Sequence, residues 1–219
     1  MLAFSNGGAM TAVAQDIRKG RKFDQVLSGA RDIFLRDGFD GASVDDIARA
    51  AGVSKATLYS YFPDKRLLFL EVAKAECRRQ ADEAEALIDD SAPVQAVLRL
   101  AAERILSFAQ SEFGQRMFRM CVAEAERFPT LGQEFYHSGP VMIRERIARY
   151  LSKAVERGDL RIDDIPLAAD QFTQLCKADL HDRLIFGVAG CCAPPEVARV
   201  IDGAVGMFMA RYGAHDGAR

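Results

Sequence analysis

Polar side chains of the kinds that bind phosphates and base edges lie close together between residues 54 and 62. Lys55 carries an ammonium that can reach a guanine edge or a phosphate, and Thr57 can donate to a phosphate or contact a thymine methyl. Tyr59 and Tyr61 have hydroxyls long enough to reach a sugar-phosphate backbone. This combination indicates a surface that binds nucleic acid, provided that the backbone presents these side chains on one element.

The flanking residues predict two short helices with a tight turn between them. Ser43 precedes Asp46 by three residues, which is the S-x-x-D spacing of a helix N-cap, and Gly52 can adopt the left-handed conformation that ends a helix. Ser54 can cap a second helix, which would begin at Lys55. The second helix would then carry the polar side chains in its first two turns.

The packing residues of this segment are spaced as in a helix-turn-helix motif. Ala48 stands four residues before the turn glycine, where two crossing helices need a small side chain, and Leu58 follows six residues after it. In such a motif the second helix enters the major groove of DNA. Lys65 would begin the next helix, whose first amides favour a phosphate. The predicted contacts here are Ser43, Ser54, Lys55, Ala56, Thr57, Tyr59, Tyr61 and Lys65.

A run of basic residues precedes the motif. Arg18-Lys19-Gly20-Arg21-Lys22 places four positive charges in five residues, so we expect residues 1–22 to form a flexible basic arm in which Arg21 and Lys22 contact DNA. The run would equally suit a solvated tail. The formal net charge of the 219-residue chain is −2, but residues 1–80 carry +3 and residues 81–219 carry −5. This distribution, unlike the total, agrees with a nucleic-acid partner.

The sequence contains no familiar catalytic, metal-binding or cofactor-binding motif. It lacks GxSxG, GxxxxGK[ST], GxGxxG and HExxH, its five cysteines lack CxxC spacing, and its three histidines lack ligand spacing. No uncharged stretch reaches the ~20 apolar residues of a membrane-spanning helix, and the first fifteen residues make a poor signal peptide. We therefore expect a cytoplasmic protein that is not an enzyme and binds no metal or cofactor.

The rest of the chain has the periodicity of helices. Apolar residues recur at helical spacing within 23–34, 94–108, 143–154 and 197–208. Asp163 and Asp164 offer caps for a further helix that would run through Leu184. No sustained alternation of β-branched residues predicts a strand. The predicted fold class is all-α.

The segment from Ser43 to Lys65 resembles the DNA-binding signature of the TetR family of transcriptional regulators. The resemblance rests on Ser43-Val44-x-x-Ile47-Ala48-x-x-Ala51-Gly52-Val53-Ser54-Lys55-x-Thr57-Leu58-Tyr59-x-Tyr61-Phe62-x-x-Lys65, with residues 23–37 as the family's first helix. Glu126-Arg127-Phe128-Pro129, 158–164 and 168–172 further resemble the AefR-like C-terminal domain. Together the resemblance extends from about residue 20 to residue 212.

The resemblance implies a three-helix helix-turn-helix DNA-binding domain at residues 23–67 and a larger helical ligand-binding and dimerisation domain at residues 68–219. It further implies a homodimer on a palindromic double-stranded DNA operator, with the two domains that contact DNA about one helical turn (~34 Å) apart. A small hydrophobic or amphipathic inducer would release this dimer. The expected function is therefore ligand-responsive transcriptional repression.

Two sets of apolar residues are candidates for the pocket and for the dimer interface. Phe and Met side chains suit an apolar or amphipathic ligand, and an apolar stripe on the last helix suits a partner helix. Such apolar residues at helical spacing more often form a core, and the stripe on the last helix would also suit the protomer's own core. The pocket candidates are Phe108, Phe113, Met117, Met120, Phe135, Tyr136, Phe172 and Leu175, and the interface candidates are Val197, Ile201, Ala204, Val205 and Phe208.

Two other functions fit the sequence. One is an activator or architectural DNA-binding dimer that senses no small molecule, which the position of its binding site relative to a promoter would distinguish. The other is a ligand carrier or enzyme with a vestigial DNA-binding domain, which the retained Thr57, Tyr59 and Lys65 disfavour.

Overall fold

The computed structural model describes residues 20–89, 91–188 and 191–214, so residues 1–19 of the predicted arm lie outside the described residues. Within these ranges the chain forms helices and no strand, apart from one isolated antiparallel bridge between Leu160 and Gly213. The predicted all-α fold class is therefore confirmed.

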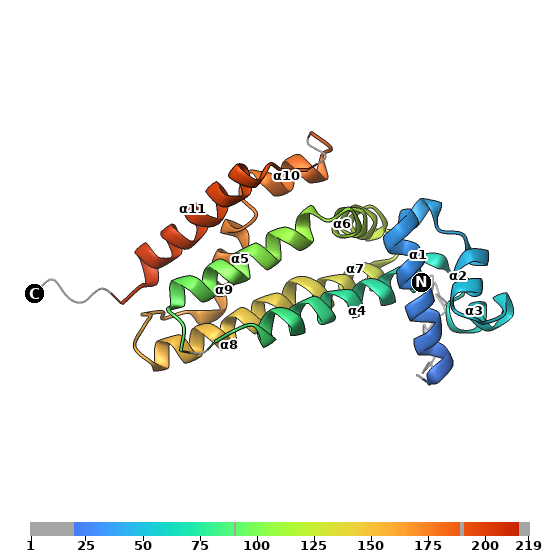
Figure 1. The fold of residues 1–219 in the computed structure, drawn as a ribbon, viewed down its shortest axis with the longest axis horizontal. Helices are drawn as coiled ribbons and strands as arrows, with labels where there is room; N and C mark the ends of the chain where they lie inside the picture. Colours follow the sequence, from blue (N-terminus) through green and yellow to red (C-terminus); the bar gives the residue numbers. More distant parts are fainter. Residues whose placement is uncertain (1–19, 90, 189–190, 215–219) are drawn as a thin grey trace, which may run out of the picture.

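Three helices form a group at one end of the molecule, which we call the three-helix head: α1 (Arg21–Gly41), α2 (Val44–Ala50) and α3 (Lys55–Tyr61) (Figure 1). Helix α1 begins two residues earlier than predicted, so exposed Arg21 and Lys22 belong to its first turn and not to a flexible arm. Its regular part ends at Gly38, whose φ of 69° a glycine adopts readily.

Helix α4 (Lys65–Ala86) leads away from the three-helix head into the larger part of the molecule (Figure 1). It crosses the predicted domain boundary at residues 67 and 68 without interruption, so both parts share this helix. The remaining helices are α5 (Val94–Gln110), α6 (Glu112–Glu124), α7 (Pro129–Tyr136), a π-helical turn (His137–Val141), α8 (Met142–Glu156), α9 (Ile165–Leu175), α10 (Leu180–Ile185) and α11 (Pro194–Tyr212).

The helix predicted to run from Asp164 through Leu184 is in fact two helices. Asp164 caps α9 as expected, because its carboxylate accepts a hydrogen bond from the Leu167 amide at 3.0 Å. Helix α9 ends at Leu175 and a turn follows. The turn ends at Asp179, which has a φ of 66°, a conformation that Asp tolerates better than most residues. Leu180 and Leu184 are fully buried beyond the break. The prediction was wrong because apolar spacing alone did not reveal the change of direction.

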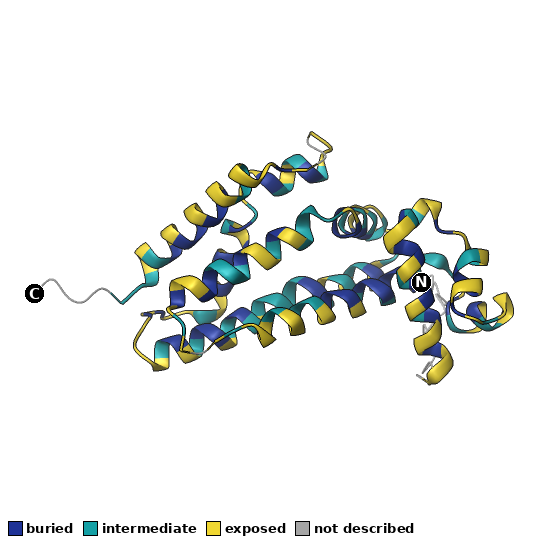
Figure 2. Cartoon of the chain, viewed as in Figure 1, coloured by how far each residue is buried: buried dark blue, intermediate teal, exposed yellow. Residues whose placement is uncertain are grey.

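The buried apolar residues form two hydrophobic cores. One joins the three-helix head to the first half of α4 and to α6, with Phe34, Phe62 and Phe69 almost fully buried. The other lies between α5, α8, α9 and α11, with Phe172 and Phe208 at its centre. Buried positions follow one side of each long helix in Figure 2, as the amphipathic spacing requires. Helix α4 therefore reaches from one core to the edge of the other.

Candidate nucleic-acid interface and adjoining cavity

Side-chain caps fix the start of both helices in the turn motif. The hydroxyl of Ser43 accepts a hydrogen bond from the Asp46 amide at 3.0 Å, and that of Ser54 accepts one from the Thr57 amide at 3.1 Å. Gly52 between them has a φ of 64°. The two predicted caps and the predicted glycine turn are confirmed, so the sequence placed α2 and α3 correctly.

The exposed side of α3 carries most of the predicted contacts. Lys55, Ala56 and Tyr59 are exposed, Thr57 is half-buried, and Leu58 beneath them is buried in the core. Tyr61 is half-buried because its ring packs edge-on against Phe23, with ring centroids 5.9 Å apart. Helix α3 therefore presents polar groups in its first turns, as the second helix of such a motif does when it faces a DNA groove.

An acidic residue that the sequence reasoning missed holds Lys55. The Asp45 carboxylate on α2 lies 2.5 Å from the Lys55 ammonium. This hydrogen bond, followed by the opposite charge of Asp45, raises the pKa of Lys55, so the lysine stays charged. A phosphate must therefore compete with Asp45 for Lys55.

Lys65 begins α4, as predicted, and its ammonium has partners within the chain. Its ammonium donates to the carbonyl oxygens of Phe39 at 2.7 Å and Ala42 at 3.0 Å, and lies 4.5 Å from the centroid of the Phe39 ring. These contacts tie the start of α4 to the segment that joins α1 and α2. Lys65 thus holds the three-helix head on α4.

A glycine that the sequence reasoning also missed sets the distance between α1 and the turn. Gly29 is buried on α1, and a β-carbon placed on it would lie 2.5 Å from the backbone nitrogen of Ala51 and 2.8 Å from its β-carbon. Such separations are well inside van der Waals contact. Only glycine allows α1 to approach the end of α2 this closely.

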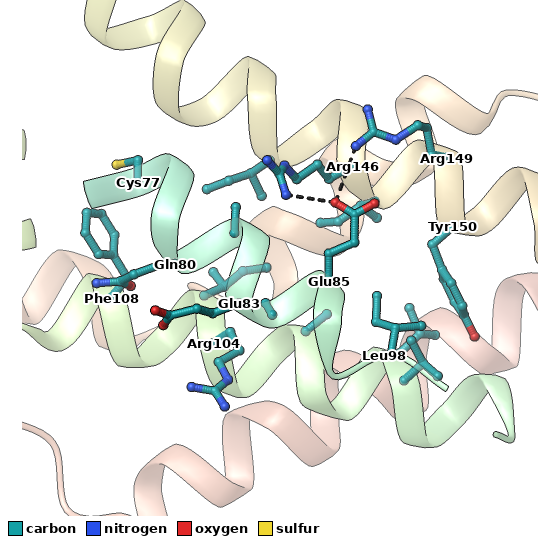
Figure 3. Close-up of a pocket in the computed structure, with 18 of the residues that line it drawn as sticks. Cys77, Gln80, Glu83, Glu85, Leu98, Arg104, Phe108, Arg146, Arg149 and Tyr150 are labelled. Carbon is teal, nitrogen blue, oxygen red and sulfur yellow. Dashed lines mark hydrogen bonds and ion pairs between the residues drawn. The ribbon is translucent and has the colours of Figure 1, made fainter. Parts of the chain in front are cut away.

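A cavity of about 670 Å³ lies between α4, α5 and α8 (Figure 3). Its size is within the range of small-molecule sites. The apolar part of its wall comes mainly from α5 and α8, and the polar part from all three helices. Because α4 starts against the three-helix head and ends at this cavity, one continuous helix joins the two sites.

The cavity differs from the predicted pocket. Of the eight predicted pocket residues, Phe108 alone lines the cavity within the described chain. Phe113 and Met117 are buried in the core shared with the three-helix head, Phe172 is buried in the other core, and Tyr136 is about half exposed. Met120, Phe135 and Leu175 pack at the edges of these cores. Helical spacing of large apolar residues marks a buried face, but it does not distinguish a core from a cavity wall.

Comparisons with known proteins match both parts of this architecture. The family described as bacterial regulatory proteins, tetR family, matches residues 26–72, and the family described as AefR-like transcriptional repressor, C-terminal domain, matches residues 96–214. The chain belongs to the TetR family of transcriptional regulators. It is therefore a DNA-binding regulator and not an enzyme.

Individual relatives agree with this family membership. The HTH-type transcriptional regulator RutR of Escherichia coli K12 is 29% identical over 147 residues, which cover 66% of this chain and 67% of RutR. A putative TetR-family regulator from Mesorhizobium loti is 29% identical with a TM-score of 0.77, over 90% of this chain and 98% of that one. The flavonoid-responsive regulator FrrA is 34% identical with a TM-score of 0.64, over 89% and 98%.

Other kinds of site find little support in the described part of this TetR-family chain. Its described ranges contain no group of three His, Cys, Asp or Glu side chains arranged to hold a metal ion. They also contain no helix that is both long and apolar enough to span a membrane. Burial raises the pKa of Cys77, Cys121 and Cys176 to about 12, so these thiols are packing residues of low reactivity.

A buried carboxylate links the cavity wall to the three-helix head of the regulator. Glu76 on α4 is only 4% exposed and accepts hydrogen bonds from Arg31 of α1 at 2.8 Å and from Arg79 and Gln80 of the cavity wall, both at 3.0 Å. Burial alone would raise the pKa of Glu76, but these hydrogen bonds outweigh it and lower the pKa to about 2. Glu76 is therefore ionised at neutral pH.

The structure also corrects the predicted dimer interface of the regulator. Ile201, Ala204, Val205 and Phe208 are at most 4% exposed within a single protomer, and Val197 packs against the same core. A partner subunit cannot contact side chains that the protomer already covers. The opposite side of α11 is exposed (Figure 2) and carries Arg199, Asp202, Gly203, Gly206, Met207 and Ala210. The apolar stripe was therefore core, and the two glycines lie on the accessible face.

Proposed function

We propose that this TetR-family regulator is a cytoplasmic, homodimeric transcriptional repressor that releases a palindromic operator when a small hydrophobic or amphipathic molecule occupies the cavity. The observation that carries the proposal is the path of α4, which begins beneath the three-helix head and ends as a wall of the cavity. A ligand that favours one position of α4 would therefore change the spacing of the two heads on DNA. It can do so only to the extent that it binds the two positions with different affinity.

Glu76 supports this coupling because it connects the two sites directly. Arg79 and Gln80 belong to the cavity wall and share the Glu76 carboxylate with Arg31 of α1. A ligand that moves either wall residue would leave Glu76 with fewer partners on α4. The hydrogen bonds that join α1 to α4 through Glu76 would then change, and the orientation of the three-helix head would shift.

Footprinting tests the proposal. The regulator, incubated with DNA from upstream of its own coding sequence, should protect a palindromic site that overlaps a promoter. A panel of apolar and amphipathic compounds should include at least one that removes this protection. Flavonoids are a rational first class, because one similar solved protein is titled a flavonoid-responsive regulator. Protection upstream of a promoter that no compound relieves would favour an activator or an architectural dimer.

Substitution of Lys55 should weaken operator binding by removing one phosphate or base contact. We expect Lys55→Ala to lower the slope of log affinity against log salt concentration by about one. Asp45→Asn should act in the opposite direction, since it frees the Lys55 ammonium. Fluorescence anisotropy titrations at several salt concentrations would measure both effects. Arg211→Ala, in the last turn of α11, is the control, and an equal effect there would contradict the assignment.

Substitution on the exposed face of α11 should separate the subunits. Met207 is 63% exposed, and neither Gly203 nor Gly206 has a neighbour within contact of an added β-carbon. The two glycines would let a helix of the partner subunit approach closely. Met207→Glu should therefore give a monomer in analytical ultracentrifugation and lose operator binding, whereas Val122→Glu, at an exposed position of α6, should not. A dimer that persists in Met207→Glu would contradict this interface.

A further inference from the structure

The cavity is apolar in its interior. Val97, Leu98 and Ile147 are at most 9% exposed and line it, and Ile88 and Ile105 line it from partly buried positions. A ligand that fills this space must therefore present an apolar body to these side chains.

The polar residues of the wall carry an excess of positive charge. Five cationic side chains line the cavity, namely Arg79, Arg104, Arg146, Arg149 and Lys153, and two carboxylates line it, Glu83 and Glu85. Two carboxylates outside the wall, Glu76 and Asp82, pair with Arg79 and Arg146. Glu85 lies 2.8 Å from Arg146 and 3.6 Å from Arg149 (Figure 3). The wall itself therefore holds five cations and two carboxylates, and its arginines Arg79, Arg146 and Arg149 already have carboxylate partners.

Arg104 differs from the other arginines of the wall. Within the described residues it forms no salt bridge, whereas Arg79, Arg146 and Arg149 each have at least one carboxylate partner. On α5, Ala101 lies one turn before Arg104 and Phe108 lies one turn after it. Both residues line the same cavity. Figure 3 draws Arg104 near Glu83, whose carboxylate pairs with Arg79. The Arg104 guanidinium is exposed, so it stands at the mouth of an apolar space.

We infer that the cavity binds an amphipathic anion, whose acidic group pairs with Arg104 at the mouth while its apolar or aromatic body lies against Leu98, Ile105 and Ile147. The inference rests on the proposed ligand-responsive function and specifies the chemical class of its effector. A neutral ligand offers no charged acceptor to the exposed Arg104 guanidinium, whose N–H donors would stay with water. An acidic ligand replaces that water with a charge-assisted hydrogen bond.

A pair of fluorescent probes that differ in one charge tests this inference directly. 1-Anilinonaphthalene-8-sulfonate is an aromatic amphipathic anion, and N-phenyl-1-naphthylamine is the same molecule without the sulfonate. We expect both to bind the full-length protein at one site per chain, with the sulfonate about tenfold tighter, as one partly solvated charge-assisted hydrogen bond allows. Displacement of each probe by the other would show that they share the site.

Three variants connect this preference with the cavity and with Arg104. Arg104→Gln should weaken sulfonate binding about tenfold and leave the neutral probe unchanged, because it removes one charged donor. Arg78→Gln is the matched control, since Arg78 is exposed on α4 and does not line the cavity. Ala101→Phe should reduce binding of both probes by filling the cavity. Circular dichroism and thermal unfolding would verify that each variant folds.

The outcomes separate the inference from the proposed function. Equal binding of the two probes, or sulfonate binding that Arg104→Gln leaves unchanged, would overturn the acidic ligand and leave the ligand cavity in place. Binding of neither probe, or binding of both that Ala101→Phe does not reduce, would contradict the cavity as a ligand site and with it the proposed function.

Discussion

Replacing Gly29 by alanine is expected to abolish DNA binding, although Gly29 is not a predicted DNA contact. The added methyl would lie 2.5 Å from the Ala51 backbone nitrogen, and a backbone atom cannot rotate away as a side chain can. Helix α1 must therefore move off the α2–α3 turn. Overpacking of this kind costs about 3 kcal/mol, and the displaced helix would tilt α3 away from the groove.

Two measurements check this prediction. Urea unfolding followed by circular dichroism should show a lower midpoint for Gly29→Ala, and an electrophoretic mobility shift assay should show loss of the operator complex. Ser28→Ala makes the same kind of change at the neighbouring, exposed position of α1 and should preserve both properties. Wild-type affinity in Gly29→Ala would show that α1 and the turn can separate without cost.

Replacing Glu76 by glutamine should destabilise the regulator and weaken the response of DNA binding to a ligand. The amide keeps the shape of the side chain but removes the charge that Arg31 and Arg79 share. Breaking a buried ion pair costs about 3–5 kcal/mol. We expect about 2 kcal/mol here, because both arginines are more than one third exposed and water can partly replace the lost carboxylate.

The pH dependence of stability distinguishes this charge from simple packing. The pKa of Glu76 falls from an ordinary 4.5 to about 2 in the folded protein, so its stabilisation is complete above pH 4.5 and is lost as the pH falls towards 2. The difference in unfolding free energy between the wild type and Glu76→Gln should therefore be constant near neutral pH and shrink across this interval. Glu71→Gln, at a more accessible position on the same helix, is the control. A difference that does not vary with pH would contradict the assignment.

Features that depend on neighbours in the sequence were predictable. The Ser43 and Ser54 caps and the Gly52 turn involve residues within a few positions of each other, so their spacing alone indicated the motif. Residues 176–179 show the limit of this reasoning, because a turn that ends at Asp179, with its positive φ, divides a stretch whose apolar spacing looked continuous. Spacing indicates which face of a helix is buried, but it does not indicate what covers that face.

The sequence by itself therefore determined the helical class, the family resemblance and the polar face of α3. The tertiary structure decided the function of residues whose partners are distant in the chain. Arg31 and Glu76 meet across 45 positions, and the cavity forms only where α4, α5 and α8 come together. The physical reason is that local propensity depends on short-range backbone geometry, whereas close helix contacts, buried charges and cavities depend on how separate helices pack.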